Sequence, residues 1–297
     1  MTTRPLRVAL AANLVFSSAC GLALIVGGGD VATWMGTIPA WFMMALGVGL
    51  LGFAGLLGFV LARLRIGWAL LISVLDILWV LATLPLTLIP GLLSSEGKVV
   101  VVVVAACVAL VAFLQLRGIR SALGGGADDP GMYRHCVRLQ SRARPDDLWR
   151  AVRNLGAIAQ YAPGLSESKL VGASEPRPGA TRICTNHQGQ SWAEDVVCLD
   201  DRARTVLLRF QTEAPDFPLP FSEMEGGWIV APAPNDRATV DIWWTVRPKM
   251  RRFGWVALAL MTIPLDRDIP RIVAAMEADG QDDMQMLSVR LPALRIC

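Results

Sequence analysis

The chain has 297 residues, of which 54% are apolar and 18% are charged, and its formal net charge is +3. Globular proteins average about 45–50% apolar and about 25% charged residues. The imbalance lies in residues 1–120, which hold seven Lys or Arg and three Asp or Glu. Residues 121–297 hold 21 Lys or Arg and 22 Asp or Glu. Because the second part has no basic tract, we expect no nucleic-acid partner.

Four apolar runs occupy the first part of the chain, at residues 8–26, 40–62, 67–90 and 99–116. A helix needs roughly 20 apolar residues to cross a bilayer, so the sequence predicts a four-helix transmembrane region over residues 1–120. The alternative for the first run is a secretory or lipoprotein signal ending near Cys20. That run is longer than the roughly 7–15 apolar residues of a signal core, which favours a membrane helix.

Basic residues predict the orientation of these helices. Arginines precede the first run, separate the second from the third, and follow the fourth: Arg4, Arg7, Arg63, Arg65, Arg117 and Arg120. The positive-inside rule places these segments in the cytoplasm. We therefore expect an integral protein of a bacterial-type plasma membrane with both termini cytoplasmic.

Asp76 is a polar residue near the middle of the third run, in the stretch ISVLDILW. A carboxylate at this depth costs a few kcal/mol and usually faces a bundle interior. Two interpretations stay open: a proton or ligand site, or a packing residue that is hydrogen-bonded to Asn13 or Gln115.

Six cysteines are spread along the chain, with no CxxC pair. This spacing resembles neither a disulfide framework nor a zinc site, and it favours a reducing compartment. We expect no metal and no cofactor.

The second part begins with a glycine-rich linker at residues 121–131, SALGGGADDPG. The sequence then predicts a strand at 133–142, a helix at 144–156 and a short helix at 157–161. Six strands follow, each bounded by turn residues, at 168–174, 180–187, 190–200, 204–213, 221–233 and 237–248. Short turns between neighbouring strands predict a curved antiparallel sheet with one buried face.

The last element before the tail is the apolar segment 253–265, which leads into residues 271–280. A helix here would cover the sheet, although Pro264 and Pro270 should each break or kink it. Alternatively, residues 253–265 could lie at the membrane interface, with Lys249, Arg251 and Arg252 on anionic headgroups. Residues 281–297 are predicted to form a C-terminal tail.

Residues 131–280 resemble the SRPBCC, or START-like, superfamily, in its polyketide cyclase/dehydrase and lipid-transport branch. The resemblance rests on DDLWRAVRNLGAIAQYAPGLSESKLVG, on the strand GQSWAEDVV, on PLPFSEMEGGWIVAP and on ATVDIWWTVRPK. Tyr161 stands where the family commonly has Trp. The resemblance implies an α+β helix-grip fold, a curved sheet around a C-terminal helix, with a hydrophobic cavity at residues 132–280.

Candidate cavity residues come from the turn after the short helix and from aromatic positions on the strands. They are Tyr161, Pro163, Trp192, Glu194, Phe210, Trp228 and Trp243. Neither His135 nor His187 has an evident carboxylate partner, and Glu194 and Asp195 point to opposite faces of one strand. No catalytic residue is assigned.

These features favour a membrane-anchored protein that binds a hydrophobic small molecule or a lipid, as a carrier or a sensor. An enzyme is the alternative, a cyclase or dehydratase that uses Glu194, His187 or Tyr161 on a polyketide-like substrate. A membrane-tethered interaction or signalling module is a further alternative, and the sequence identifies no protein partner.

Overall fold

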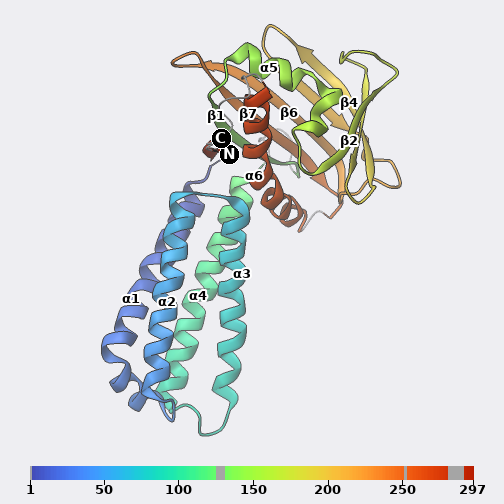
Figure 1. Ribbon diagram of the computed structural model, residues 1–297. Helices are drawn as coiled ribbons and strands as arrows, with labels where there is room; N and C mark the ends of the chain where they lie inside the picture. The colour runs from blue at the N-terminus through green and yellow to red at the C-terminus, as the bar shows by residue number, and fades with distance from the viewer. Residues whose placement is uncertain (1, 125–130, 251–252, 280–290) are drawn as a thin grey trace. The chain divides into compact units, whose positions relative to one another are not determined.

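The structure is a computed structural model that describes residues 2–124, 131–250, 253–279 and 291–297 (Figure 1). It divides into two compact units, Met1–Ala122 and Leu123–Cys297. Most of the predicted linker, at 125–130, lies outside the described residues. So do Arg251, Arg252 and residues 280–290, where the predicted tail begins.

The first unit consists of four helices, each long and apolar enough to cross a membrane. They are α1 (Arg4–Met35), α2 (Ala40–Ala62), α3 (Ile66–Thr83) and α4 (Ser95–Ala122), and the 3-10 helix η1 (Leu84–Leu88) extends α3. Large apolar side chains such as Val15, Leu22 and Val26 are exposed on the outside of this unit. The predicted four-helix region is thereby confirmed.

Glycines bring α1 and α4 into backbone contact. A Cβ atom added to Gly97 would lie 2.4 Å from the Met35 carbonyl oxygen, and one added to Gly118 would lie 2.7 Å from Leu6 Cα. Small residues allow helices to approach this closely. In lipid, where no hydrophobic force drives helices together, the resulting van der Waals packing stabilises their association.

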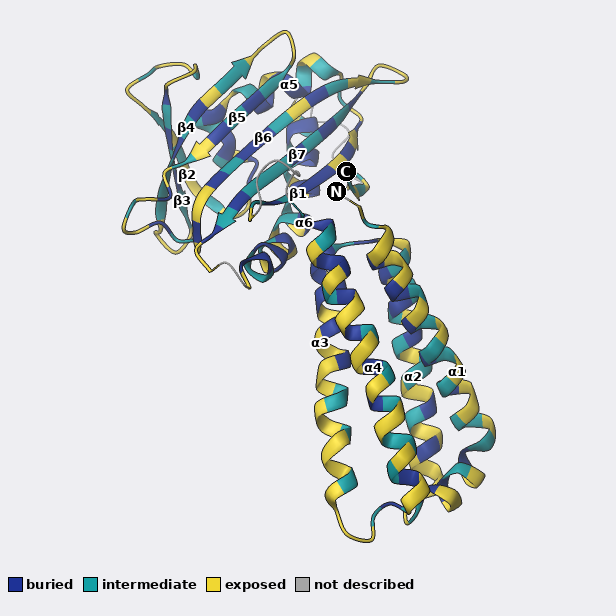
Figure 2. Ribbon diagram, turned by 180° about the vertical axis from the view of Figure 1, so that it is seen from behind, coloured by how far each residue is buried: buried dark blue, intermediate teal, exposed yellow. Residues whose placement is uncertain are grey.

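The second unit contains one antiparallel sheet of eight strands in the order β2-β3-β4-β5-β6-β7-β1-β8 (Figure 2). The strands are β1 (Tyr133–Ser141), β2 (Leu165–Val171), β3 (Thr181–Asn186), β4 (Ser191–Asp200), β5 (Thr205–Phe210), β6 (Phe221–Ala233), β7 (Arg237–Pro248) and β8 (Leu294–Ile296). Strands β2 to β7 form a meander, and β1 closes it by pairing with β7.

Helices α5 (Pro145–Arg153), η2 (Leu155–Gln160) and α6 (Gly254–Asp279) lie against the inner face of this sheet (Figure 1). The core joins Leu148 and Val152 of α5 to Ile269 and Val273 of α6 and to the inward side chains of the strands. A curved sheet around a C-terminal helix is the predicted helix-grip fold, which is confirmed.

Helix α6 does not end at either proline, so of the two predicted effects, a break or a kink, the break does not occur. Pro264 and Pro270 both lie inside it, although each removes one backbone hydrogen-bond donor. Leu258 before the prolines and Val273 after them are both fully buried. Packing on both sides of the prolines therefore holds the helix together.

Strand β8 and a disulfide were not predicted. Cys136 of β1 is bonded to Cys297, with 5.4 Å between the Cα atoms and 161 residues between them in sequence. Leu294–Ile296 pairs with β1 next to this bond. The expectation that the cysteines form no disulfide is wrong for this pair, because the two become neighbours only in the folded sheet.

Candidate functional site

A cavity of about 600 Å³ lies between the inner face of the sheet and helices η2 and α6. Its walls come from β3, β4, β5, β6 and β7, from Val152 of α5, and from Met261, Pro264 and Ile272 of α6. Ligand pockets usually measure about 300–1,000 Å³ and are mainly apolar. The cavity therefore has the size of a small-ligand site.

Aromatic rings form much of the wall. Four strands contribute Trp192, Phe210, Trp228 and Trp244, and the loop before β6 adds Phe217. Phe210 and Phe217 meet edge to face, with ring centroids 6.4 Å apart. Gly226 makes room for these rings, since a Cβ there would lie 3.2 Å from Trp244 and 3.5 Å from Phe210.

Trp243 lies on the outer face of the sheet, so the prediction that it lines the cavity is wrong. A Cβ on Gly227, the cross-strand partner of Trp243, would lie 2.4 Å from the Trp243 ring. The guanidinium of Arg134 lies 5.3 Å from the centre of that ring. Adjacent strand residues face opposite ways, and it is Trp244 that faces the cavity.

A buried ion pair provides the main polar group of the wall. Arg182 of β3 and Glu194 of β4 are direct cross-strand partners, and the Arg182 Nη2 atom donates a hydrogen bond to Glu194 Oε2. Their side chains are only 9% and 3% exposed. Trp192 Nε1 donates to Glu194 Oε1 at 2.7 Å. The carboxylate therefore accepts two hydrogen bonds from inside the cavity wall.

Burial and Glu194 act in opposite directions on the pKa of Arg182. Burial favours the neutral guanidinium, but the neighbouring carboxylate outweighs it, and the pKa of Arg182 is raised. Cys184 lines the cavity on the same strand. Burial, together with the Glu194 charge, raises the pKa of its thiol to about 11, so it is not a nucleophile at neutral pH.

The rim of the cavity is polar. Asn186, Gln188 and Gln190 line it from the β3–β4 hairpin. The Asn186 side chain holds this hairpin together, because its oxygen accepts hydrogen bonds from the backbone N–H groups of Gln188 at 3.0 Å and Gln190 at 2.9 Å. An apolar interior with an amide-lined rim suits a mainly apolar ligand with a polar end.

Tyr161 and Pro163 frame the cavity without lining it. Tyr161 is buried in the core, and its hydroxyl donates to Asp279 at the end of α6. Burial and this carboxylate raise the pKa of Tyr161 to about 12. Pro163 is exposed, and its carbonyl oxygen lies 3.2 Å from His187 Nε2. Both candidates fix the turn whose other residues, Ala162 and Gly164, do line the cavity.

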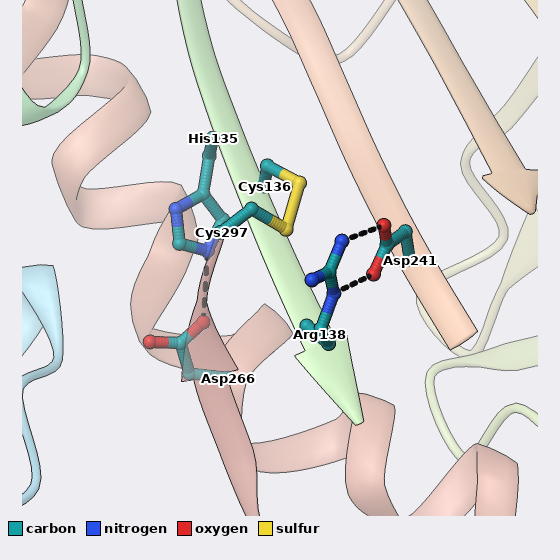
Figure 3. The surroundings of a disulfide bond; sticks show 6 residues. All are labelled: His135, Cys136, Arg138, Asp241, Asp266 and Cys297. Atoms are coloured by element: carbon teal, nitrogen blue, oxygen red, sulfur yellow. Dashed lines mark hydrogen bonds and ion pairs between the residues drawn. A yellow bond between two sulfur atoms is a disulfide. The ribbon is translucent and has the colours of Figure 1, made fainter. Parts of the chain in front are cut away.

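A second buried pair lies beside the disulfide (Figure 3). His135 Nε2 of β1 is 2.9 Å from Asp266 Oδ1 of α6, and the His135 ring stacks on Trp244 with centroids 6.3 Å apart. This carboxylate partner was not predicted, because it lies 131 residues further along the chain. His135 does not line the cavity, so the pair ties α6 to the sheet.

In the first unit, Asp76 of α3 is 4% exposed. Its Oδ2 atom accepts a hydrogen bond of 2.7 Å from Asn13 Nδ2 of α1, one of the two partners considered for it. Among the described residues, no group of His, Cys, Asp and Glu could hold a metal ion.

Residues 136–279, just under half of the chain, match the family model described as polyketide cyclase / dehydrase and lipid transport. A comparison with curated proteins found no match.

Two enzymes are among the structures similar to this chain. The ZhuI aromatase/cyclase of Streptomyces sp. R1128 has a TM-score of 0.42 and 12% identity, over 50% of this chain and 93% of that one. A norcoclaurine synthase point mutant of Thalictrum flavum has a TM-score of 0.42 and 16% identity, over 50% of this chain and 97% of that one. A Thermobifida fusca protein has a TM-score of 0.40 and 25% identity, over 50% of this chain and 93% of that one. On the family match, residues 136–279 form a domain of the polyketide cyclase/dehydrase and lipid transport family.

Proposed function

We propose that this protein binds a hydrophobic small molecule or a lipid in the cavity of its second unit, as a carrier or sensor held at a membrane by its four helices. The observation that carries the proposal is the cavity itself. It is about 600 Å³ in volume, and its one buried ion pair is internally compensated. A ligand therefore needs no net charge to satisfy the wall, and burial of its apolar surface supplies the affinity.

The ligand also needs a polar end. Arg182 Nε is buried and has no hydrogen-bond partner among the described residues. An unsatisfied buried donor costs about 1–3 kcal/mol. A carbonyl, hydroxyl or ester oxygen of the ligand would accept this hydrogen bond. We therefore expect a mainly apolar molecule that carries at least one oxygen acceptor.

The tether supports a membrane source for the ligand. Leu123, the residue directly after α4, accepts a hydrogen bond of 2.9 Å from the backbone N–H of Arg134 in β1. Helix α4, which is apolar enough to span a bilayer, ends at Ala122, and β1 begins at Tyr133, so the chain between them is short. Such a short connection keeps the domain and the bilayer at a high effective concentration.

Helix α6 offers a surface for contact with the bilayer. Leu260 and Ile263 are each 52% exposed, and Phe253, just before the helix, is 65% exposed. Met261 and Pro264, on the same stretch, line the cavity. A bilayer that covers this exposed face would lie next to the cavity wall, which provides a route for ligand exchange. Leu260→Glu should slow exchange with vesicles without lowering the occupancy of the cavity.

Ligand extraction from the purified full-length protein tests the proposal. We expect a stoichiometric apolar compound in the wild type, measured by mass spectrometry. Leu208→Trp should displace it, because Leu208 lines the cavity. Leu207→Trp is the matched control, since its side chain is on the opposite face of the same strand. If no compound is recovered from the wild type, or if both variants retain it equally, the proposal fails.

An enzyme on a polyketide-like substrate is the second candidate. The observation that favours it is Glu194, a buried carboxylate in the cavity wall beside a guanidinium. Glu194→Gln would then abolish turnover of a polyketide-like substrate under conditions in which the variant is folded. His187 and Tyr161, the other candidate acids or bases, do not line the cavity.

A further inference from the structure

A separate cavity of about 290 Å³ lies inside the four-helix unit. All four helices line it, among others with Phe16 of α1, Gly49 and Phe53 of α2, Asp76 and Trp79 of α3, and Val108 of α4. The wall is almost entirely apolar, and Asp76 is its one ionisable carboxyl group.

Asp76 is held in place by a short chain of hydrogen bonds. Asn13 Nδ2 donates to Asp76 Oδ2 at 2.7 Å, and Ser17 Oγ donates to Asn13 Oδ1 at 3.1 Å. All three residues are at most 4% exposed. The amide of Asn13 thus orients the carboxyl group from behind, while Asp76 itself borders the cavity.

This arrangement exceeds what an anchor requires. A buried carboxyl group among membrane helices costs a few kcal/mol, and apolar helices anchor a protein without one. The cavity wall contains no Lys, Arg or His that would compensate the charge. Protein atoms enclose most of this carboxyl group, which is 4% exposed, and the residue borders the cavity. A ligand that hydrogen-bonds to Asp76 explains both the residue and the volume.

We propose that the cavity of the four-helix unit binds a small apolar molecule that carries one hydrogen-bond donor, a hydroxyl or a protonated amine, which Asp76 accepts. The apolar part of the molecule lies against Phe16, Phe53 and Trp79. This site is separate from the cavity in the second unit, and its occupancy does not depend on the function proposed for that cavity.

Carbodiimide labelling of the full-length protein in lipid nanodiscs tests the proposal. N,N′-dicyclohexylcarbodiimide modifies carboxyl groups in apolar surroundings, and the Asp76 peptide is followed by mass spectrometry. The competing probes are decan-1-ol, N,N-dimethyldecylamine and decane, which carries no donor. At about ten times its dissociation constant, a bound probe slows labelling about tenfold. We expect this slowing from the alcohol or the amine and little from decane.

Two glycines of α2 provide matched variants. A Cβ atom added at Gly49 or at Gly52 meets no atom within 4 Å, but only Gly49 lines the cavity. Gly49→Phe should remove the protection by the alcohol or amine, and Gly52→Phe should retain it. The proposal is overturned if wild-type Asp76 is not labelled, if no donor-bearing probe protects it, or if decane protects equally well. These wild-type results need no variant to fold.

Discussion

Replacing Glu194 by Gln removes the negative charge beside Arg182 and leaves the shape of the side chain almost unchanged. The Gln oxygen can still accept the hydrogen bond from Trp192 Nε1, so the change isolates the charge. The side chain of Arg182 is 9% exposed, and its other described protein contact is a hydrogen bond of 3.5 Å to the Leu155 carbonyl oxygen. The guanidinium would therefore stay buried without a counter-ion.

Removing one partner of a buried ion pair costs about 3–5 kcal/mol, because the other charge is left uncompensated. Because Glu194 is only 3% exposed, the cost for a buried pair applies here. Solvent-exposed pairs contribute only about 0–1 kcal/mol. The Arg209–Glu225 pair is the matched control, since its side chains are 61% and 32% exposed.

The assay is urea unfolding of the full-length protein in micelles, followed by tryptophan fluorescence. We expect Glu194→Gln to lower the free energy of unfolding by about 3–5 kcal/mol, and Glu225→Gln by no more than about 1 kcal/mol. Adding Arg182→Met to Glu194→Gln should recover much of the loss, because no buried charge then remains. Equal effects of the two Glu→Gln changes would show that the buried pair contributes no more to stability than the exposed one.

Three other predictions concern separate parts of the molecule. In a Tyr133→Phe variant, tyrosinate absorbance should show Tyr161 titrating near pH 12. Because folding raises this pKa from about 10, the contribution of Tyr161 to the free energy of unfolding should be fully present below pH ~10 and should fall as the pH rises towards 12. Cys297→Ala opens a loop of 161 residues and should cost up to about 5 kcal/mol, and reductant should lower the melting temperature of the wild type but not of the variant. Gly118→Leu should destabilise the helix bundle in thermal melts in micelles, because a Cβ there would lie 2.7 Å from Leu6 Cα, whereas Gly55→Leu, with no atom within 4 Å, should not.

Local patterns predicted most of the fold. Apolar runs gave the four membrane helices, and turn residues gave six strands of the meander, because helix length and strand boundaries are local properties. Strand β8 could not be predicted in this way. It has three residues, and its position depends on pairing with β1 in the folded chain.

The cavity was harder to predict residue by residue. Alternation shows that Trp243 and Trp244 face opposite ways. Trp244 is in step with Val240, Ile242 and Val246, which are all buried, so the apolar pattern of the strand carried the signal for Trp244. Arg182 was missed, although a signal was available: it lies among apolar residues in a predicted strand, with Glu194 on the next. Tyr161 was placed close to the cavity, but its side chain is directed to Asp279 instead.

The disulfide bears on the predicted orientation. Basic residues favour a cytoplasmic second unit, whereas disulfides persist in oxidising compartments and are rare in the cytosol. Alkylation of free thiols in intact cells, before and after reduction, would show the state of Cys136 and Cys297. An oxidised pair in growing cells would contradict the cytoplasmic orientation, and a reduced pair would agree with it.

Photo-crosslinking tests directly whether an apolar ligand occupies the cavity of the second unit. Membranes that contain the full-length protein are loaded with a lipid that carries a diazirine on its acyl chain, and the crosslinked peptides are identified by mass spectrometry. We predict crosslinks at cavity residues such as Trp228 and Ile272, which Leu208→Trp abolishes and Leu207→Trp preserves. Crosslinks confined to the four apolar helices, with none in the cavity wall, would show that the lipid does not enter this cavity.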